Sequence, residues 1–300
     1  MRCNLCATEL SPEQPPVWRK DGFEIVRCRS CGLVFRRALP TVAEVMAIYR
    51  EAYFRNEDGR DAQGYSDYLR EAQEHRLTAR RRLDRIERTT APDRLLDVGC
   101  AAGFFVDEAA QRGWRAQGID VSPHMSGWGR EHLGLELETG LFQEAGFPES
   151  SFDRVTMWDY IEHSIDPAAD FEKAATVLRP GGHLLLSTGD ISSLVARLSG
   201  HRWHLLTPRH HNFFFTPDTL RMYLQRSGFE VVRVTRPPAD YSLRYVTYKL
   251  RTMAPGSRPV RGLADWMARW ALGKRAIPLN LFDIVTIEAR IPDGRDPAST

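Results

Sequence analysis

The stretch RLLDVGCAAG, residues 94–103, predicts the fold of this chain. It reads as a buried strand followed at once by a turn of small residues. Residues 104–112 then have the pattern of an amphipathic helix, which ends at Gly113. A second apolar strand, Arg115 to Asp120, closes this unit with an acid. Short apolar runs continue to alternate with amphipathic stretches, which is typical of a parallel α/β sheet.

The turn favours a ligand of the nucleotide type. Small residues let the backbone approach a ligand at a helix N-terminus, and Asp120 at the tip of the second strand can bind both ribose hydroxyls. A dinucleotide-binding turn would read G-x-G-x-x-G, whereas the third position here is Ala101 and the sixth is Phe104. The leading Asp97 suits a ligand with a cationic amino acid tail and no pyrophosphate.

Three segments resemble class I S-adenosylmethionine (SAM) methyltransferases. The run D-x-G-x-A-x-G over residues 97–103 is similar to their first motif, which usually has Gly where this chain has Ala101. FPESSFDRVTMWDYIEH, residues 147–163, and LRPGGHLLLST, residues 178–188, are similar to their fourth-strand and fifth-strand segments. The resemblance spans about residues 94–236 in order and spacing. It implies a Rossmann-like α/β sheet of seven strands, the last one antiparallel.

The resemblance implies SAM as the cofactor. Asp97, Gly99 and Gly103 would shape the methionine end of its site, and Asp120 would hold the ribose. The full set of expected cofactor-binding residues is Asp97, Gly99, Cys100, Ala101, Gly103, Asp120, Val121, Leu141, Phe142 and Trp158.

The adenine side departs from the family pattern. Many relatives carry an acid after the third strand, where this chain has Leu141, Phe142 and Gln143. We expect the first two to pack on the base and a backbone group or the Gln143 amide to supply polarity. Trp158 at the end of the fourth strand faces either the cofactor cleft or the core, and Cys100 in the turn is a small apolar filler.

Four of the five cysteines form two identical pairs near the N-terminus, Cys3-x-x-Cys6 and Cys28-x-x-Cys31. With no apolar leader segment behind the first residue, this spacing predicts a four-thiolate zinc ribbon. Two disulfides or a redox pair are the alternatives, and the missing signal peptide and βαβ context disfavour both. The zinc is expected to be structural, because four thiolates leave no position for water, and to supply folding energy to a module of about 40 residues.

The segments around the cysteines carry local signals as well. Asp21-Gly22 predicts the turn of a short hairpin between the pairs, and Thr41 with Glu44 predicts a capping box at the start of a helix. A second helix, residues 66–88, is rich in arginine. We interpret its arginines as a solvated face with i,i+4 ion pairs, the alternative being an RNA-contacting patch.

Histidines gather on the expected acceptor side. After a helix over residues 191–198, residues 200–215 hold four His, one Trp and three Phe. This stretch resembles a block of zinc-ribbon methyltransferases and of groups that methylate sugars, quinone precursors and other small metabolites. By that resemblance His211 matches the recurring His. A hydroxyl must lose its proton during methyl transfer, so we expect His211 as the general base, with His204 or His163 as alternates. Each of them could instead pack on aromatics or cap the backbone.

These observations predict a SAM-dependent O-methyltransferase of a small metabolite, either a sugar-containing or an aromatic natural product. N-methylation or C-methylation, a zinc-ribbon RNA methyltransferase and a non-catalytic scaffold remain as rivals. A formal net charge of +2 over 300 residues argues against nucleic acid as the partner. No stretch approaches the roughly 18 apolar residues of a spanning helix, so we expect a cytoplasmic protein without membrane contact.

The expected organisation has four parts. They are a zinc ribbon (1–40), a helical linker forming a cap over the cofactor site (41–90), the methyltransferase domain (91–291) with insertions at 189–216 and 237–281, and a frayed tail (292–300). The second insertion bounds the acceptor pocket or forms the face of a homodimer. Its apolar stripe, with Leu263 and Trp266 among its members, is interpreted as core packing.

Overall fold

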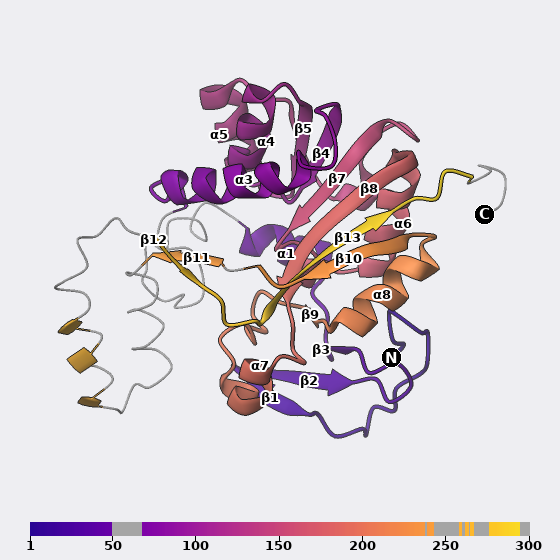
Figure 1. Ribbon diagram of the computed structural model, residues 1–300. Helices are drawn as coiled ribbons and strands as arrows, with labels where there is room; N and C mark the ends of the chain where they lie inside the picture. The colour runs from indigo at the N-terminus through magenta and orange to yellow at the C-terminus, as the bar shows by residue number, and fades with distance from the viewer. Residues whose placement is uncertain are drawn as a thin grey trace.

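The centre of the computed structural model is a mixed seven-stranded sheet with the strand order β10-β13-β8-β7-β4-β5-β6 (Figure 1). The strands are β4 Arg94–Val98, β5 Arg115–Asp120, β6 Leu137–Thr139, β7 Phe152–Trp158, β8 Leu178–Gly189, β10 Glu230–Thr235 and β13 Ile284–Arg290. β13 runs antiparallel to both of its neighbours, and all other neighbouring pairs are parallel. The predicted sheet with an antiparallel last strand is confirmed. The structure describes residues 1–49, 68–237, 239–242, 258–259, 262–263, 265–266 and 276–294.

Helices cover both faces of this sheet (Figure 1). On one face lie α3 Ala72–Ile86, α4 Phe104–Gln111 and α5 Pro123–Leu133, and on the other α6 Pro167–Val177 and α8 Pro217–Arg226. Successive residues of a strand point to opposite faces. Leu95 therefore packs with Leu83 and Phe105 of the first group, whereas Leu96 shares a core with Phe171 and Leu220 of the second.

Two helices of the second group begin at capping residues. Asp166 accepts a hydrogen bond from Ala169 N at the start of α6, and Thr216 forms a capping box at the start of α8. The strand after α6, β8, begins at Leu178. Leu178 pairs with Phe152 of β7 and His183 pairs with Arg154, so the register shifts between these two pairs.

The N-terminal ribbon pairs with a distant segment. β1 Trp18–Lys20, β2 Phe23–Arg27 and β3 Val34–Arg36 form a sheet with β9 Phe213–Phe214, in the order β1-β2-β3-β9. Asp21 and Gly22 have φ of 52° and 82°, the left-handed conformation that a tight hairpin turn of this kind requires. The hairpin is confirmed. The fourth strand, from the acceptor-side loop, was not predicted.

The ribbon also shares its core with the rest of the chain. Cys3, Leu5, Cys28 and Leu33 lie in the same buried cluster as Leu96 of the central sheet. Burial against the central sheet therefore contributes to holding the ribbon in place, in addition to any metal.

Other predicted segments are shorter or lie outside the described residues. α1, Val42–Ile48, begins with the expected capping box of Thr41 and Glu44. The helix predicted from residue 66 is described as α3 from Ala72, with residues 66–67 outside the described part, and the one predicted from residue 191 as α7 Leu194–Ser199. Three short 3-10 turns are η1 Phe142–Glu144, η2 Ile161–His163 and η3 Gly200–Arg202.

The second predicted insertion is described only in part. β11 Ala239–Ser242 pairs antiparallel with β12 Ala276–Leu279. Leu263 and Trp266 are 50% and 58% exposed, so the prediction that they pack in the core is wrong. The remaining members of the apolar stripe, Met267 and Trp270 among them, lie outside the described residues. Within the described residues, no helix combines the length and the apolar character needed to cross a bilayer.

Candidate functional site

The turn between β4 and α4 is shaped by glycines in the left-handed region. Gly99 and Gly103 have φ of 75° and 80°, and Ala101 adopts φ 48° between them. A Cβ on Gly99 would lie 2.7 Å from the ring of Tyr160, so a larger residue has neither the conformation nor the space. The turn of small residues therefore lies at the N-terminus of α4.

Asp120 joins this turn to the start of α5. Its Oδ2 accepts a hydrogen bond from Ala101 N and its Oδ1 accepts one from Ser122 N, both at 2.8 Å. Burial raises the pKa of Asp120, and the two amides oppose that effect. The carboxylate is thus held at the tip of β5, beside the half-buried Val121.

Asp97 is a second buried acid at the same edge. It is 4% exposed and accepts a hydrogen bond of 2.6 Å from Thr156 Oγ1. Burial raises the pKa of Asp97 to about 7, and the charge of Asp120 acts in the same direction, whereas that of Arg82 opposes it. Two acids that influence one another across this turn suit a ligand that carries a cationic group.

Arg82 of α3 reaches the end of β7, which the sequence did not predict. Its guanidinium lies 4.4 Å from the ring centroid of Trp158, and its Nη2 is 3.0 Å from Asp159 Oδ2. Trp158 also packs edge-on against Phe105, with ring centroids 5.7 Å apart. The Nε1 of Trp158 is buried without a hydrogen-bond partner. Trp158 therefore packs against Phe105 of the core, and the face of its ring is covered by the guanidinium of Arg82.

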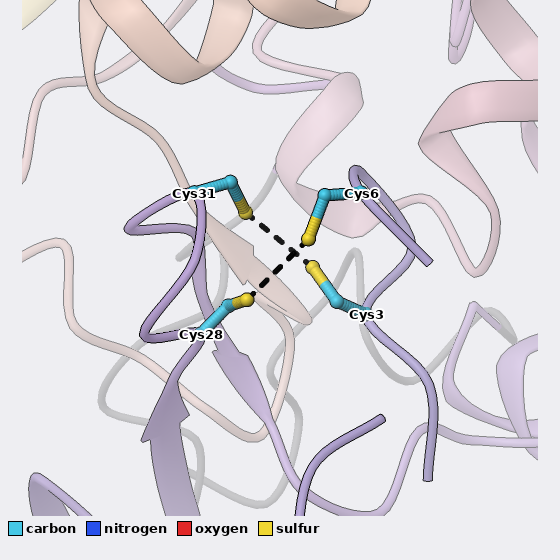
Figure 2. A group of neighbouring side chains, drawn as sticks. All are labelled: Cys3, Cys6, Cys28 and Cys31. Carbon is cyan, nitrogen blue, oxygen red and sulfur yellow. Dashed lines mark hydrogen bonds between the residues drawn. The ribbon is translucent and has the colours of Figure 1, made fainter. Parts of the chain in front are cut away.

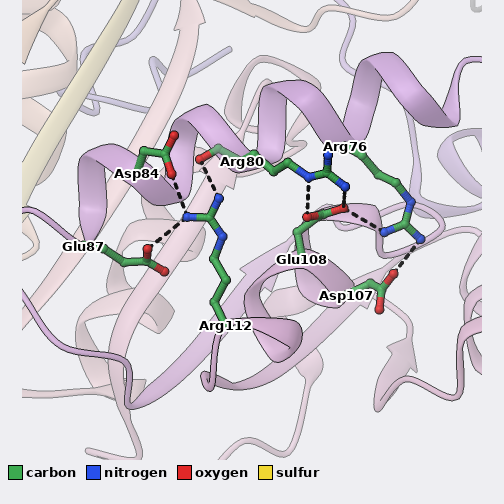
Figure 3. A network of polar contacts seen from close by, with 7 residues as sticks. All are labelled: Arg76, Arg80, Asp84, Glu87, Asp107, Glu108 and Arg112. Atoms are coloured by element: carbon green, nitrogen blue, oxygen red, sulfur yellow. Dashed lines mark hydrogen bonds and ion pairs between the residues drawn. The ribbon is translucent and has the colours of Figure 1, made fainter.

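Other arginines of α3 pair across to α4 (Figure 3). Arg76 Nη1 and Arg80 Nε contact the buried carboxylate of Glu108 at 3.0 and 2.8 Å. Arg112 reaches back from the end of α4 to Asp84 at 2.7 Å. The predicted i,i+4 pairing is therefore wrong for Arg76 and Arg80, because their partners lie on the neighbouring helix, although the side chain of Arg80 is 54% exposed.

The adenine-side residues differ from the expectation. Phe142 is 2% exposed and packs with Phe147 in the main core. The amide nitrogen of Gln143 donates to Asp170 Oδ1 at 2.9 Å. Leu141 and Gln143 are half-buried.

Cys100 behaves as the predicted apolar filler. Its side chain packs with Val106 and Leu137, and a Cβ on Gly118 would lie 2.7 Å from its Sγ. Its backbone contributes to the turn, where Cys100 N donates to Ile119 O at 3.1 Å.

Two of the predicted histidines meet at the carboxyl end of the sheet. The rings of His163 and His211 lie 4.7 Å apart at 88°. His163 Nδ1 is 2.8 Å from the hydroxyl of Tyr49, which follows α1, and His211 Nδ1 is 2.8 Å from Leu205 O. Burial lowers the pKa of His163 to about 4, so that this imidazole is neutral at pH 7.

Glu162 completes this group. It is 6% exposed, and burial together with the charge of Asp159 raises its pKa to about 8. Its Oε2 is buried without a hydrogen-bond partner. One ligand-capable atom of each of Glu162, His163 and His211 lies within 4.8 Å of the others, an arrangement that can hold a proton or a cation. A small cavity here is lined by Glu162, Thr188, Trp203, His211, Phe213 and Phe214.

His204 does not belong to this group. Its Nδ1 lies 3.5 Å from Asp283 Oδ2, and its side chain is 5% exposed. The same carboxylate oxygen accepts a hydrogen bond of 3.0 Å from Trp203 Nε1. The pair anchors the loop to Asp283, the residue before β13, and His204 as an alternate base stays a prediction.

Asn212, which the sequence did not single out, connects three segments. Its backbone N donates to Glu162 O, and its Nδ2 donates to His163 O and Ser164 O at 2.9 and 3.1 Å. Its Oδ1 accepts a hydrogen bond of 3.2 Å from Arg36 of β3. Asn212 as a whole is 2% exposed. Asn212 thus ties the ribbon to the Glu162–His163 segment.

The four N-terminal cysteines converge on one point (Figure 2). Cys3 Sγ and Cys31 Sγ are 3.5 Å apart, as are Cys6 Sγ and Cys28 Sγ, and all four sulfurs lie within 4.8 Å of one another. None of them forms a disulfide. Four sulfurs at this spacing fit the tetrahedral coordination of zinc, with Zn–S distances of about 2.3 Å.

Comparison with known proteins agrees with this geometry. A family model described as a methyltransferase domain matches residues 68–234. The chain belongs to this family. The ubiquinone biosynthesis O-methyltransferase of Azoarcus sp. (strain BH72) is 31% identical over 157 residues, which are 48% of this methyltransferase and 67% of the relative. The enzyme of the same name from Aromatoleum aromaticum is 31% identical over 167 residues, 51% and 71% of the two chains.

A solved structure shows the same fold. The SAM-dependent methyltransferase from Archaeoglobus fulgidus covers 74% of this methyltransferase and 98% of its own chain, with a TM-score of 0.50 and 17% identity. Family and fold together make this protein a SAM-dependent methyltransferase. The ribbon lies outside the matched residues 68–234 of this methyltransferase.

The turn of the methyltransferase fits its cofactor. There is no room for a Cβ at Gly99, so the turn at this position consists of backbone atoms alone. Asp97 and Asp120 place two carboxylates next to it. SAM carries a ribose and a cationic amino acid tail, which are the groups that such acids bind.

Proposed function

We propose that this methyltransferase transfers the methyl group of SAM to a hydroxyl of a small metabolite, either sugar-containing or aromatic. The observation that carries this proposal is the pair formed by the buried Glu162 and the half-buried His211, which both line one small cavity. The O-methyltransferase names of the two relatives support it. Nucleic acid is disfavoured, because arginines of α3 are engaged with α4.

Each part of the cofactor has a suitable partner. We assign the ribose to Asp120, the cationic amine to Asp97 and the methionine carboxylate to Arg82, whose guanidinium lies on Trp158. Leu141 would pack on the base. SAM supplies a methyl group already activated by a sulfonium, so catalysis rests on placing the acceptor hydroxyl in line with it.

His211 is the better base of the two neighbouring histidines. Leu205 O can only accept, so the hydrogen bond at Nδ1 fixes the proton there and leaves the lone pair on Nε2. As the acceptor oxygen forms its bond to the methyl carbon, Nε2 takes the hydroxyl proton. The lowered pKa of His163 makes its imidazole a weaker base.

Glu162 supports the charge that develops on His211. Its raised pKa means that it holds a proton near neutral pH, and an imidazolium nearby would favour its ionised form. Glu162 and His211 can then share one proton during turnover.

The first test asks what accepts the methyl group. Protein is incubated with methyl-labelled SAM and either a small-molecule extract or total RNA. We expect label in a small molecule as an ether that survives mild alkali. Label in RNA only, or no transfer to either pool, would contradict the proposal.

The second test concerns the base. His211→Ala should retain SAM affinity and lose turnover by a factor of about 10² to 10⁴. His204→Ala serves as the matched control, because that residue contacts Asp283 and not Glu162. Unchanged turnover in His211→Ala would remove His211 from the mechanism.

We further propose that Cys3, Cys6, Cys28 and Cys31 hold a structural zinc ion, as their spacing and mutual distances support. The domain division at about residues 40 and 90 remains our proposal as well. Elemental analysis of the purified protein tests the metal, and cobalt substitution with its thiolate charge-transfer bands tests the ligands.

A further inference from the structure

Arg36 is a buried cation at the end of β3. It is 8% exposed, and its guanidinium lies 4.3 Å from the ring centroid of Phe23. Its Nη1 donates to Asn212 Oδ1 at 3.2 Å, and its Nε is buried without a hydrogen-bond partner. The side chain is therefore fixed in direction but only partly satisfied by the protein.

Among the described residues, the guanidinium of Arg36 forms no ion pair with a carboxylate, and its hydrogen-bond acceptor Asn212 is a neutral group. Glu44 acts on it from a distance, but that carboxylate accepts hydrogen bonds from Thr41 N and Oγ1 at 2.8 and 2.9 Å. A buried cation without a counter-ion is unfavourable, so such a residue needs a partner when the site is filled.

The position of Arg36 relates it to the acceptor side. Asn212, its hydrogen-bond partner, also binds the backbone of Glu162, His163 and Ser164. The guanidinium is thus one side chain away from the segment that carries the proposed proton-transfer group. It approaches that segment from the zinc ribbon.

We propose that Arg36 binds an acid group, a carboxylate or a phosphate, of the methyl acceptor, so that the zinc ribbon takes part in substrate recognition. This inference rests on the proposed function. The planar fork of arginine matches both anions, and the ring of Phe23 holds its plane. The acceptor is then an acidic small molecule and not a neutral one.

The products of the labelling reaction test this first. Label from SAM is transferred into a small-molecule extract, and the products are separated on an anion-exchange column at pH 7. We expect the labelled product to be retained. A neutral labelled product would overturn the role of Arg36 and leave methyl transfer standing, whereas the absence of any product would contradict the proposed function.

Variants of two adjacent arginines test the residue. Arg36→Met should raise KM for the retained acceptor about 10- to 100-fold, without changing SAM affinity. Arg36→Lys keeps the charge without the fork and should give a smaller increase. Arg37→Met is the matched control with unchanged KM, since Arg37 pairs with Glu24 at 2.7 Å on the ribbon. Equal KM values in wild type and Arg36→Met would refute the proposal.

Anion binding provides a measurement that needs no turnover. The protein saturated with S-adenosylhomocysteine is titrated calorimetrically with benzoate and with inorganic phosphate. We expect wild type to bind one of them at least about tenfold more tightly than Arg36→Met. No difference between the proteins would overturn the proposal. If anion binding depends on Arg36 but the labelled product is neutral, then Arg36 binds a free anion and not the methyl acceptor. That result would also overturn the proposal.

Discussion

Replacing Asn212 with alanine would remove three hydrogen bonds that join distant parts of the chain. Its side chain donates to His163 O and Ser164 O and accepts from Arg36. Asn212 is 2% exposed, so in the alanine variant water does not readily replace the amide as the hydrogen-bond partner of these three groups.

The size of the effect follows from the chemistry of the three bonds. Each bond to a neutral carbonyl contributes about 0.5–1.5 kcal/mol, and the one from a charged guanidinium contributes about 1.5–3 kcal/mol. We therefore expect Asn212→Ala to lower the free energy of unfolding by about 2.5–6 kcal/mol. The KM for the acceptor should also rise, because the bonds to His163 O and Ser164 O fix the segment that contains Glu162.

Asn4 offers a matched control for this measurement. It too joins the ribbon to the rest of the chain through one charged and two neutral groups, namely Asp166 Oδ1, Ala168 N and the Tyr223 hydroxyl. Its contacts lie at α6 and α8 and not beside Glu162. Asn4→Ala should therefore lose comparable stability but keep the KM for the acceptor.

Urea denaturation of the zinc-loaded proteins, followed by tryptophan fluorescence, measures the stability of both variants. SAM affinity, measured by calorimetry, should be unchanged in each. A loss of less than about 1 kcal/mol in Asn212→Ala would refute the connecting role of this residue. So would an acceptor KM that rises equally in Asn4→Ala.

Three further predictions concern the metal, the buried acids and the core. Cys28→Ser should lower both zinc content and Tm, as measured by elemental analysis and calorimetry; an unchanged Tm would show that the metal adds no stability. Burial raises the pKa of Asp97 to about 7, so the folded state retains this proton while the unfolded chain releases it, and the free energy of unfolding should fall as pH rises from about 4 to 7. Asp97→Asn should remove the part of this pH dependence that Asp97 contributes, as measured by denaturation curves at several pH values. Glu162 and Asp170 contribute with the same sign in both proteins, so the dependence becomes smaller and does not vanish. An identical slope of unfolding free energy against pH in the two proteins would contradict the prediction. Gly118→Ala should destabilise by about 1–3 kcal/mol, because its Cβ would lie 2.7 Å from a buried sulfur; wild-type stability in urea would be the contrary result.

Much of the fold could be predicted because its signals are local. The hairpin turn at Asp21-Gly22 and the caps at Asp166 and Thr216 depend on neighbouring residues alone. The central strands follow from short apolar runs at regular spacing. The pairing of β3 with β9 could not be predicted, because nothing within either short segment specifies a partner about 180 positions away.

The roles of the arginines were also beyond the sequence. Arg76, Arg80 and Arg82 occupy one helix and look alike in a charge pattern. Only the packing of the helices shows that Arg76 and Arg80 form ion pairs with Glu108. Arg82 lies instead over the ring of Trp158. An ion pair between helices depends on the approach of two surfaces, for which an i,i+4 rule along one helix has no information.

The sequence by itself determined the cofactor turn and the thiolate cluster. Both are defined by spacing within a few residues, so short-range chain geometry is enough to bring Gly99 to Gly103 into one turn and each cysteine pair into one knuckle. Tertiary structure alone decided what each histidine contacts. His204 and His211 lie in one short loop of the sequence, but the first contacts Asp283 and the second contacts His163. The environment of an imidazole, and hence its proton affinity, is set by groups that arrive from distant segments.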